Sequence, residues 1–332
     1  MPCRFVDVEI GFIGLGRMGG NMSLRLLKKG HRVIGFDLSQ AAVQSYASKG
    51  TVPAQDWGDF VKRFEGKPRV MWIMVPAGDP TTQAIDTLAA LGDPGDIIVD
   101  GGNTNWKIAL EDSKRVRAKN MHYVDAGVSG GIWGLEFGYS LMVGAEDDVY
   151  KHILPILKDL APENGGLVHA GPEGSGHFVK MVHNGVEYGL MQAYAEGFQV
   201  MKLSRQFPGM DMHAIAEAWR EGSVVRSWLL DLIARGLEQD PELSDIKGYV
   251  EDTGEGRWTV ETAIDEAVPT PIIAESLFAR FRSRMENTFG DRMLAMMRQQ
   301  FGGHSVVKDA SSEQSQPAGV PAPPARGVPE TK

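Results

Sequence analysis

The segment GFIGLGRMGGNM, residues 11–22, decides how the first half of the chain folds. It carries the pattern Gly14-x-Gly16-x-x-Gly19, directly after a short apolar run at residues 8–14 and directly before a helix-like stretch. Glycines allow a tight turn and let other groups come close to the backbone. A helix that begins at such a turn offers unpaired N–H groups and a favourable dipole to an anion. The segment therefore predicts a strand, a phosphate-binding turn and a helix in succession.

Short apolar runs and longer helix-compatible segments alternate through the first half of the chain. This alternation favours a mostly parallel sheet with helices on both faces. After about residue 176 the strand patterns stop, and long helical patterns follow without a repeat of fixed period. We expect an α/β Rossmann-type doubly wound N-terminal domain followed by an all-α C-terminal domain. The expected strands are VEIGFIG (8–14), HRVIGFD (31–37), RVMWIMV (69–75), DIIVD (96–100), MHYVDAG (121–127), SLMVG (140–144) and GLVHA (166–170), and the expected later helices span 177–203, 211–236 and 258–300, the last broken at Pro269 and Pro271.

The change of pattern predicts a domain boundary near residue 175. We expect a dinucleotide-binding domain at residues 1–175 and a helical domain for substrate binding and dimerisation at residues 176–304. Residues 305–332 are rich in Pro, Ala, Ser and Gly, a composition that cannot form a packed core. We therefore expect a disordered tail there.

Asp37 makes the glycine pattern more specific, because it ends the next apolar run after the turn. An acidic residue about 20 positions beyond the glycines accepts hydrogen bonds from a ribose 2′-hydroxyl, while the glycines serve the turn, the pyrophosphate and helix packing. A carboxylate repels a 2′-phosphate, and DLSQ, residues 37–40, holds no arginine to receive one. We predict NAD as the cofactor and NADP as a weaker one. The alternative is a glycine-rich turn beside an ordinary strand-end aspartate.

Composition excludes several classes of protein. The 332-residue chain, with 42% hydrophobic and 23% charged residues, has the make-up of a soluble globular protein, and its net charge of −9 argues against a nucleic-acid binder. Cys3 is the single cysteine and the eight histidines lack metal-binding spacing, so we expect no disulfide and no metal. The N-terminal MPCRFVDVEIGF has no signal-peptide stretch, and no apolar run of about 18 residues follows. We expect a cytoplasmic protein that does not bind membranes.

Three loops that follow expected strands are rich in glycine and short polar residues. They are VPAGD (75–79), DGGNTNW (100–106) and GVSGGIWG (127–134). In an open parallel sheet, ligands bind outside the carboxyl ends of the strands. The three loops together predict a binding site, although each alone is also typical of ordinary turns. The residues expected to contact the cofactor are Gly14, Leu15, Gly16, Arg17, Met18, Gly19, Asp37, Val75, Pro76, Ala77 and Asn103.

The segment GHFVKMVHNGVEYG, residues 176–189, combines a polar stripe with helical spacing. The stripe consists of Lys180, His183, Asn184, Glu187 and Tyr188. A solvated helix face is the ordinary explanation of such a stripe. Histidine, asparagine and tyrosine are less usual on solvated faces, however, and the nearby glycines favour close packing against another backbone. We therefore expect a buried helix with one polar wall for a ligand, on which a lysine and a glutamate can act as base and acid.

These motifs together resemble the decarboxylating 6-phosphogluconate dehydrogenases. The resemblance rests on GFIGLGRMGGNM, DGGNT, GVSGG, SLMVG and GHFVKMVHNGVEYG, runs from about residue 8 to residue 304, and is closest to the family's short form. It implies NAD-dependent oxidative decarboxylation of 6-phospho-D-gluconate to D-ribulose 5-phosphate and CO2, in the pentose phosphate pathway and gluconate utilization. Lys180 matches the general base on the 3-hydroxyl, and Glu187 matches the acid that protonates the enediol. The positions that match substrate-binding residues are Asn103, Ser129, Gly130, Gly131, His183, Asn184, Tyr188, Arg226, Arg298 and His304.

The C-terminal segment RQQFGGH, residues 298–304, has the spacing of the family's tail motif. In the family this tail reaches into the site of a neighbouring subunit. The resemblance therefore implies a homodimer or homotetramer in which Arg298 and His304 complete the neighbour's site. The alternative for both is a basic helix end, because cations favour a helix C-terminus. The alternative for Arg226 is an ordinary arginine of an amphipathic helix.

The chain departs from the family pattern at three places. Asp37-Leu38-Ser39 stands where long-form members have Asn-Arg-Thr, and the missing arginine agrees with the NAD prediction. Pro76 stands where the family often has a lysine near the cofactor. Thr253 stands where the family has a phosphate-binding lysine, which leaves part of the phosphate site open and makes Arg226 a candidate to compensate.

Two other functions stay open at this stage. One is a non-decarboxylating NAD-dependent β-hydroxyacid dehydrogenase that acts on a small acid and has no use for Glu187 or Arg298. The other is a dinucleotide-binding sensor or scaffold without turnover, against which the presence of both Lys180 and Glu187 argues.

Overall fold

The computed structural model describes residues 9–303 and 305–307. The chain divides into two compact units, Met1–Phe281 and Arg282–Lys332. Most of the tail expected at residues 305–332 lies outside the described residues, as does Cys3. The predicted boundary near residue 175 stays a prediction, and the first compact unit extends beyond it because the first helix after the last strand packs on the sheet.

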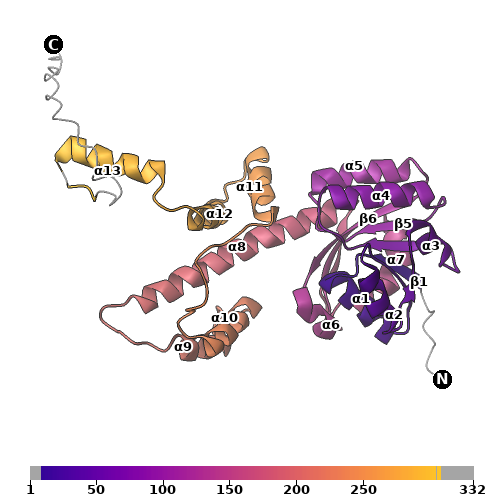
Figure 1. Cartoon of the computed structure of the whole chain (residues 1–332), viewed down its shortest axis with the longest axis horizontal. Coiled ribbons are helices and arrows are strands. Elements are labelled where there is room, and N and C mark those ends of the chain that lie inside the picture. Colours follow the sequence, from indigo (N-terminus) through magenta and orange to yellow (C-terminus); the bar gives the residue numbers. More distant parts are fainter. Residues whose placement is uncertain (1–8, 304, 308–332) are drawn as a thin grey trace, which may run out of the picture. The chain divides into compact units, whose positions relative to one another are not determined.

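An 8-stranded sheet with the order β3-β2-β1-β4-β5-β6-β7-β8 forms the core of the first unit (Figure 1). Neighbouring strands are parallel except for β6 and β7, which are antiparallel. The strand order reverses between β1 and β4, which is the point where ligands bind in doubly wound sheets. The strands are β1 (Glu9–Ile13), β2 (Arg32–Phe36), β3 (Val52–Pro53), β4 (Val70–Ile73), β5 (Ile97–Asp100), β6 (His122–Ser129), β7 (Ser140–Gly144) and β8 (Leu167–Gly171).

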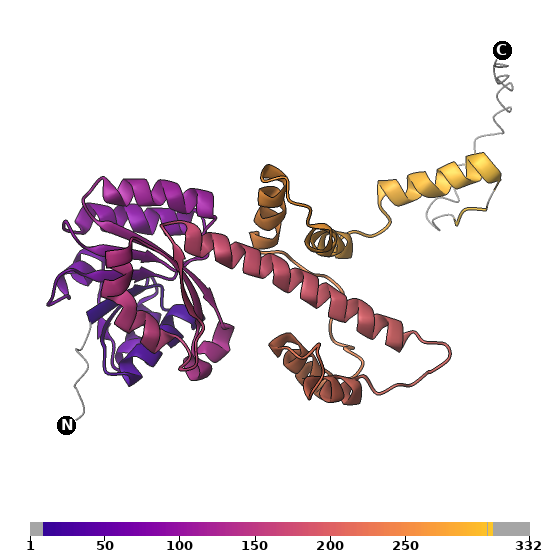
Figure 2. The same ribbon diagram turned by 180° about the vertical axis from the view of Figure 1, so that it is seen from behind.

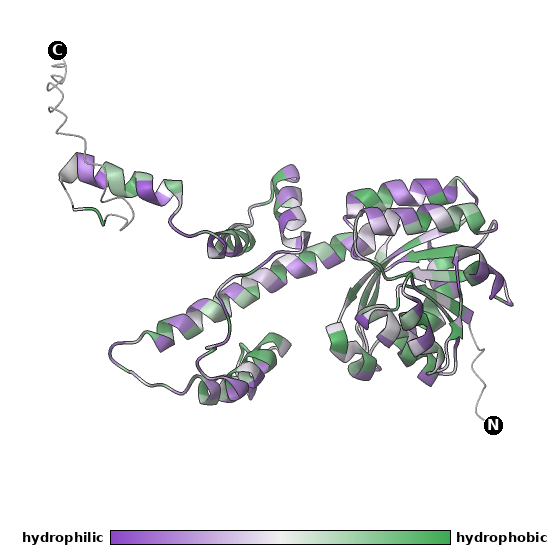
Figure 3. Cartoon of the chain, in the orientation of Figure 1, coloured by the Kyte–Doolittle hydropathy of each residue, from purple (hydrophilic) through white to green (hydrophobic). Residues whose placement is uncertain are grey.

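Helices cover both faces of the sheet, as expected for this fold. Side chains of α1, α2 and α7 pack in one hydrophobic core, and side chains of α3, α4 and α5 pack in a second one on the other face. Figure 3 shows mostly hydrophobic strands between helices of mixed character. These helices and the short elements near them are α1 (Arg17–Lys28), α2 (Gln40–Ala47), α3 (Trp57–Lys62), α4 (Asp79–Leu91), α5 (Trp106–Arg117), η1 (Gly131–Trp133), α6 (Gly134–Phe137) and α7 (Asp147–Leu160).

Only helices follow β8 in the described residues. The long helix α8 begins against β6 and β7, and its later part extends away from the sheet (Figures 1 and 2). Helix α11 packs along α8, while α9 and α10 pack on each other around a third core. The helices are α8 (Ser175–Lys202), α9 (Met212–Arg220), α10 (Trp228–Gln239), α11 (Glu255–Asp265), α12 (Pro271–Ser283) and α13 (Phe289–Gly302), the last within the second unit.

The expectation of one helix over residues 211–236 is wrong. Residues 221–227 form a break between α9 and α10, with a φ of +69° at Gly222. The hydroxyl of Ser227 accepts a hydrogen bond from the backbone N–H of Leu230 and caps the second helix. The expected pattern over 258–300 likewise divides into three helices, because a further break at residues 284–288 precedes the cap of α13 at Thr288.

Candidate active site

The glycine turn between β1 and α1 is closed at two glycines and open at the third. Gly14 has a φ of +91°, and a Cβ atom there would lie 2.4 Å from the carbonyl oxygen of Met74. A Cβ atom on Gly19 would lie 2.1 Å from the carbonyl oxygen of Gly14. Gly16, the exposed N-cap of α1, would place its Cβ atom in open space. The helix N-terminus is therefore accessible to an anionic ligand at Gly16.

Asp37 lies at the end of β2, beside this turn. Its Oδ2 accepts a hydrogen bond from the backbone N–H of Leu15 at 2.7 Å, and its Oδ1 accepts one from Ser39 at 2.7 Å. The carboxylate is half-exposed, and the next side chain, Leu38, is 84% exposed. These two bonds orient the Asp37 carboxylate against the turn, where a ribose hydroxyl can donate to it.

The other residues expected around the cofactor lie at the same edge of the sheet. Arg17 is exposed on the first turn of α1, and Met18 packs against the core beneath it. Residues 75–77 form the loop after β4, whose Pro76 carbonyl accepts a hydrogen bond from the hydroxyl of Thr81 at 2.9 Å. Because β4 is the neighbour of β1, this loop lies next to the glycine turn.

The loops after β5 and β6 are joined through Asn103. This residue has a φ of +56°, and its Oδ1 accepts a hydrogen bond from the backbone N–H of Val128 at 3.4 Å. Ser129 is the last residue of β6 and is half-buried, and Gly130 and Gly131 lead from it into η1. The structure therefore brings Asn103 to the segment that carries Ser129.

Lys180 lies against the same segment and is buried. Only 5% of its surface is exposed, and a Cβ atom on Gly127 would lie 2.3 Å from the Cβ atom of Lys180. Burial lowers the pKa of the Lys180 ammonium, while the carboxylates of Glu187 and Glu255 act in the opposite direction. The net direction is downward, which increases the neutral fraction that a general base requires.

The middle of the polar stripe is more open than its two ends. Nδ1 of His183 lies 3.0 Å from Oδ1 of Asn184 and 3.9 Å from Oε2 of Glu187. The His183 and Glu187 side chains are 37% and 40% exposed. The stripe thus has three neighbouring half-exposed polar groups one to two turns beyond Lys180, where they can meet a ligand.

Tyr188 closes the other end of the stripe. Its hydroxyl accepts a hydrogen bond from the backbone N–H of Thr253 at 3.2 Å, and its side chain is 6% exposed. The guanidinium carbon of Arg280, from α12, lies 3.5 Å from the centre of the Tyr188 ring. Thr253, which replaces the family's lysine, and Arg280 from α12 therefore both contact Tyr188.

Sequence reasoning missed Arg280 and Glu255. Glu255, the first residue of α11, is 7% exposed, and one of its carboxylate oxygens accepts a hydrogen bond from the Thr253 hydroxyl. Nothing in the local sequence around Arg280 distinguishes it from other helix arginines. Glu255 lies inside the segment VEDTGEGRWT, which resembles the family's phosphate loop. Its position in that segment could have identified it from the sequence as a candidate site residue.

Three expected substrate-binding residues are not brought to this group. Arg226 is exposed in the turn before α10, and no described contact joins it to Lys180 or Tyr188. Arg298 is exposed on α13 in the second unit. His304 lies outside the described residues. Their roles stay predictions.

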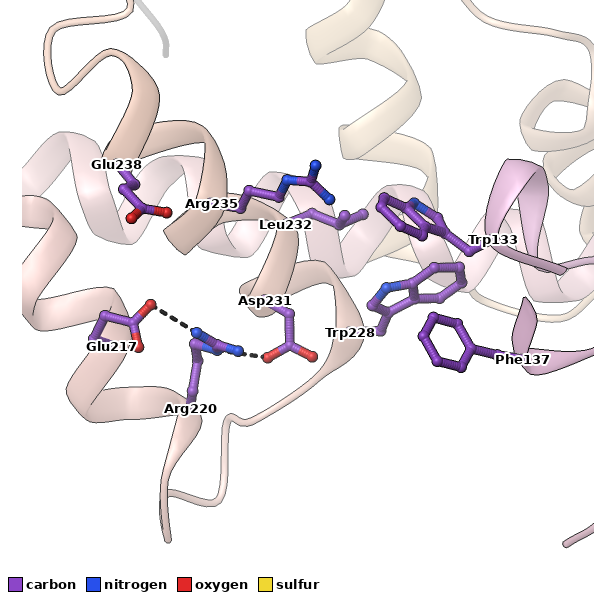
Figure 4. Close-up of a pocket in the computed structure, with 9 residues that line it drawn as sticks. All are labelled: Trp133, Phe137, Glu217, Arg220, Trp228, Asp231, Leu232, Arg235 and Glu238. Carbon is purple, nitrogen blue, oxygen red and sulfur yellow. Dashed lines mark hydrogen bonds and ion pairs between the residues drawn. The ribbon is translucent and has the colours of Figure 1, made fainter. Parts of the chain in front are cut away.

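A cavity of about 380 Å³ lies between the η1–α6 segment and helices α9 and α10 (Figure 4). Trp133, Trp228 and Phe137 gather at one end of it, and Arg220 forms ion pairs with Glu217 and Asp231 at the other. The cavity contains none of the predicted site residues, although it begins two residues after Gly131. It is therefore separate from the chemistry around Lys180.

Neither metal ligands nor a membrane span is found in the part of the chain that the structure describes. Within residues 9–303 and 305–307, no group of three or more His, Cys, Asp and Glu side chains is arranged to hold a metal ion. No helix among these residues combines the length and the apolar character needed to cross a membrane.

Comparisons with known proteins agree with this geometry. The sequence model for the NAD binding domain of 6-phosphogluconate dehydrogenase matches residues 9–171, and the model for the C-terminal domain of that enzyme matches residues 176–316. A 6-phosphogluconate dehydrogenase of Haloferax volcanii, named as NAD(+)-dependent and decarboxylating, is 42% identical over 302 residues, which are 91% of this chain and 99% of that protein. The Bacillus subtilis (strain 168) protein YqeC is 41% identical over 301 residues, 91% of this chain and 100% of that protein.

A solved structure shares both the sheet and the helices. The 6-phosphogluconate dehydrogenase of Plasmodium falciparum has a TM-score of 0.78 and 26% identity, and the match covers 92% of this chain and 67% of that one. Both halves of the chain match the same enzyme family, and one relative matches over nearly its whole length. This chain therefore belongs to the 6-phosphogluconate dehydrogenase family.

Proposed function

We propose that this chain catalyses the NAD-dependent oxidative decarboxylation of 6-phosphogluconate to ribulose 5-phosphate and CO2. The observation that carries the proposal is the burial of Lys180 against Gly127, with Glu187 two turns further along the same helix. Membership of the family supports the substrate, and the match of residues 176–316 to the family's C-terminal domain favours decarboxylation over a simple β-hydroxyacid dehydrogenase.

The glycine turn and Asp37 fit a nicotinamide dinucleotide. The accessible N–H groups of α1 at Gly16 would hold the pyrophosphate, and Asp37 would accept hydrogen bonds from the ribose of NAD. When bound, this cofactor supplies a hydride acceptor. The negative charge of Asp37 and the lack of a cation at Leu38 support NAD over NADP.

Lys180 acts first. In its neutral form it removes the proton of the 3-hydroxyl while C3 is oxidised to a ketone. The resulting ammonium stays beside the keto oxygen and polarises it. When the bond between the carboxyl carbon and its neighbour breaks, CO2 leaves, the electron pair delocalises toward that oxygen, and the Lys180 ammonium returns its proton there to give the enediol. A charged lysine in a buried position is well suited to stabilise this charge, because the surrounding dielectric is low.

Glu187 acts last. Its half-exposed carboxyl group lies on the same helix face and is near the His183 imidazole. We assign it the delivery of a proton to the carbon that has lost CO2, which completes ribulose 5-phosphate. His183, Asn184, Asn103 and the residues 129–131 would orient the hydroxyl and carboxylate groups of the substrate.

The phosphate group of the substrate would bind at the Tyr188 end of the stripe. Arg280 lies on the face of the Tyr188 ring, so it can supply the positive charge that Thr253 lacks. This makes Arg280 a better-supported candidate than the exposed Arg226.

We further propose that the enzyme is a homodimer or homotetramer in the cytoplasm, with Arg298 and His304 completing a neighbouring subunit's site. The apolar side chains of Val179, Val186 and Leu190 on α8 are 38%, 48% and 46% exposed. Exposed apolar groups in a row on one helix support contact with another subunit. Sedimentation velocity at several protein concentrations tests this assembly.

The decisive experiment measures NADH and CO2 from the same reaction. Purified protein with 6-phosphogluconate and NAD should release the two in equal amounts, faster than with NADP, and Lys180→Met should lower the release of both by about a hundredfold or more. NADH without CO2 from a small hydroxy acid would favour the β-hydroxyacid dehydrogenase instead. Binding of NAD without turnover of any sugar acid would favour a sensor or scaffold.

A further inference from the structure

A fully buried group of charged side chains lies beneath the proposed active site and has no part in the proposed chemistry. Asp100 ends β5, Asp125 lies within β6, and His177 lies in the first turn of α8. Their exposed fractions are 0%, 0% and 1%. Nε2 of His177 lies 3.1 Å from Oδ2 of Asp100. Buried charges are unfavourable unless they are paired, so the contact of His177 with Asp100 ties the first turn of α8 to the end of β5.

Asp125 caps helix α8 from the neighbouring strand. Its Oδ1 accepts a hydrogen bond from the backbone N–H of Gly174 at 2.6 Å, and its Oδ2 accepts one from the backbone N–H of His177 at 2.7 Å. The N-cap residue Gly174 has no side chain that could do this. One carboxylate of β6 thereby satisfies two of the unpaired N–H groups at the positive end of the helix.

Asp100 connects the same helix to the turn that carries Asn103. Its Oδ1 accepts a hydrogen bond from the backbone N–H of Gly102 at 2.9 Å, and its Oδ2 accepts one from the hydroxyl of Tyr123 at 3.0 Å. The ion pair with His177 is formed by the same Oδ2 atom. Asp100 is thus the common partner of the loop before Asn103 and the first turn of α8.

The backbone around this group has no room to shift. A Cβ atom on Gly176 would lie 2.5 Å from the carbonyl oxygens of Asp125 and Met142. A Cβ atom on Gly127 would likewise overlap the Cβ atom of Lys180. Lys180 lies one helical turn after His177. A displacement of His177 is therefore transmitted directly to Lys180.

The charges in the group favour a protonated histidine. Burial acts to lower the pKa of His177, but Asp100 and Asp125 outweigh it and the net direction is upward. Burial likewise acts to raise the pKa of Asp100, and the His177 imidazolium reverses that effect, so the carboxyl stays ionised. Both directions favour a charged imidazole beside an ionised Asp100, whereas burial raises the pKa of Asp125.

We propose that His177 is a positioning residue that holds the Lys180 turn of α8 in register with the Asn103 turn, through its ring Nε2 beside Asp100 and its backbone N–H on Asp125. The inference rests on the proposed function, because it concerns how two parts of that site are aligned. Hydride removal from C3 requires the lysine and the substrate hydroxyl to meet within hydrogen-bond distance, and an error of about 1 Å in such an alignment reduces turnover strongly.

The test replaces His177 by glutamine. The glutamine amide nitrogen can take nearly the position of Nε2 beside Asp100, but it is neutral. We expect the kcat with 6-phosphogluconate to fall at least tenfold, while the Kd for NAD stays within twofold. The deuterium isotope effect with substrate labelled at C3 should increase, because misalignment of Lys180 slows the hydride step. Asp125→Asn should change kcat and the isotope effect in the same directions.

A matched control separates positioning from stability. His31 is also a buried histidine, 7% exposed and 2.7 Å from Asp159, but it lies before β2 at the opposite end of the strands. His31→Gln should lower Tm and leave kcat and the isotope effect unchanged. A kcat within twofold of wild type and an unchanged isotope effect in His177→Gln would overturn the proposal. Should His177→Gln not fold, the same measurements on Asp125→Asn decide the question.

Failure of the proposed function gives a different result. In that case the wild-type protein itself does not turn over 6-phosphogluconate. The positioning role is then measured by hydrogen exchange of the backbone amides of residues 177–181. Each variant is measured at a temperature the same number of degrees below its own Tm. Exchange at these amides should be faster in His177→Gln than in His31→Gln, and equal rates would refute the positioning role.

Discussion

Replacing Asp37 by asparagine removes one negative charge from the end of β2 and keeps an oxygen of nearly the same position. The Oδ1 of asparagine can accept the hydrogen bond that Leu15 N–H now donates to Asp37, which preserves the glycine turn, while the bond from Ser39 N–H is lost. The side chain is half-exposed, and its surroundings are therefore only partly shielded from water. The substitution should change the interaction with the cofactor ribose and leave the fold intact.

The expected change in cofactor preference is large enough to measure with certainty. Hydrogen bonds to a charged group contribute about 1.5–3 kcal/mol and those between neutral groups about 0.5–1.5 kcal/mol, so the loss with NAD is about 1 kcal/mol or more. Two unit charges at about 4 Å interact by about 1 kcal/mol in water and about 4 kcal/mol near a protein surface, so removing the repulsion favours NADP by at least about 1 kcal/mol. Together these shift the ratio of the two kcat/KM values about thirtyfold toward NADP.

The assay compares kcat/KM for NAD and NADP at saturating 6-phosphogluconate. Adding Leu38→Arg should increase the shift toward NADP further, because the 84% exposed Leu38 can be replaced without loss of packing and an arginine there can bind a 2′-phosphate. Asp211→Asn is the matched control, since it makes the same charge change at the cap of α9. A ratio that changes less than threefold in Asp37→Asn would refute the assignment of NAD preference to this carboxylate.

Four further results are expected. Lys180→Met should lower kcat by about 10²- to 10⁴-fold, the usual contribution of a general base, with unchanged NAD binding by calorimetry; substantial turnover would contradict the assigned role. Because burial lowers the pKa of Lys180 from 10.5, kcat/KM should rise with pH along a limb whose midpoint lies below 10.5, and a flat profile from pH 6 to 9 would argue against a neutral lysine base. Arg280→Gln should raise KM for 6-phosphogluconate about tenfold or more in steady-state assays but not KM for NAD, whereas equal effects on both would exclude a phosphate contact. Gly185→Ala should lower the free energy of unfolding by about 1–3 kcal/mol in denaturant titrations, because its Cβ atom would lie 2.7 Å from the Thr259 side chain and this outweighs the gain in helix propensity; a stabilised variant would show that α11 can move.

The sheet was predictable because its signals are local. Each of the seven expected strands overlaps one observed strand, since buried parallel strands are short continuous apolar runs bounded by glycine or polar turns. The missed strand, β3, has only two residues, Val52 and Pro53. It was not predicted because it is so short and because proline is rare within strands. It forms because it can pair along the free edge of β2.

The helical part was less predictable, because amphipathic patterns do not show where a helix stops. Residues 221–227 keep apolar spacing between α9 and α10, but Gly222 adopts a left-handed conformation and Ser227 starts a new helix. The close approach predicted from the glycines of α8 is confirmed at Gly176 and Gly185 and absent at Gly197, where a Cβ atom would meet nothing. The expectation of a buried α8 with one polar wall is wrong for the single chain, because the apolar side chains of Val186 and Leu190 are 48% and 46% exposed.

The candidate site shows the same limit on a smaller scale. Lys180 and Glu187 were predictable because they share one helix and one spacing. Arg280 and His177 were not, because their roles depend on partners far away in the sequence: Tyr188 for the arginine and Asp100 for the histidine. Long-range contacts of this kind leave no periodic trace, so only the folded chain reveals them.

The distance between the two buried ends of the stripe distinguishes the competing functions. A helix rises about 1.5 Å per residue, so Lys180 and Tyr188 lie about 12 Å apart along the α8 axis. The sheet buries the first end, α11 and α12 pack at the second, and Arg280 lies at the second end. A small hydroxy acid at Lys180 cannot reach Arg280, so a simple hydroxyacid dehydrogenase would make no substrate contact at this end. A six-carbon acid with a terminal phosphate makes use of both ends, because its reacting carbons and its dianionic group lie at opposite ends of one extended chain.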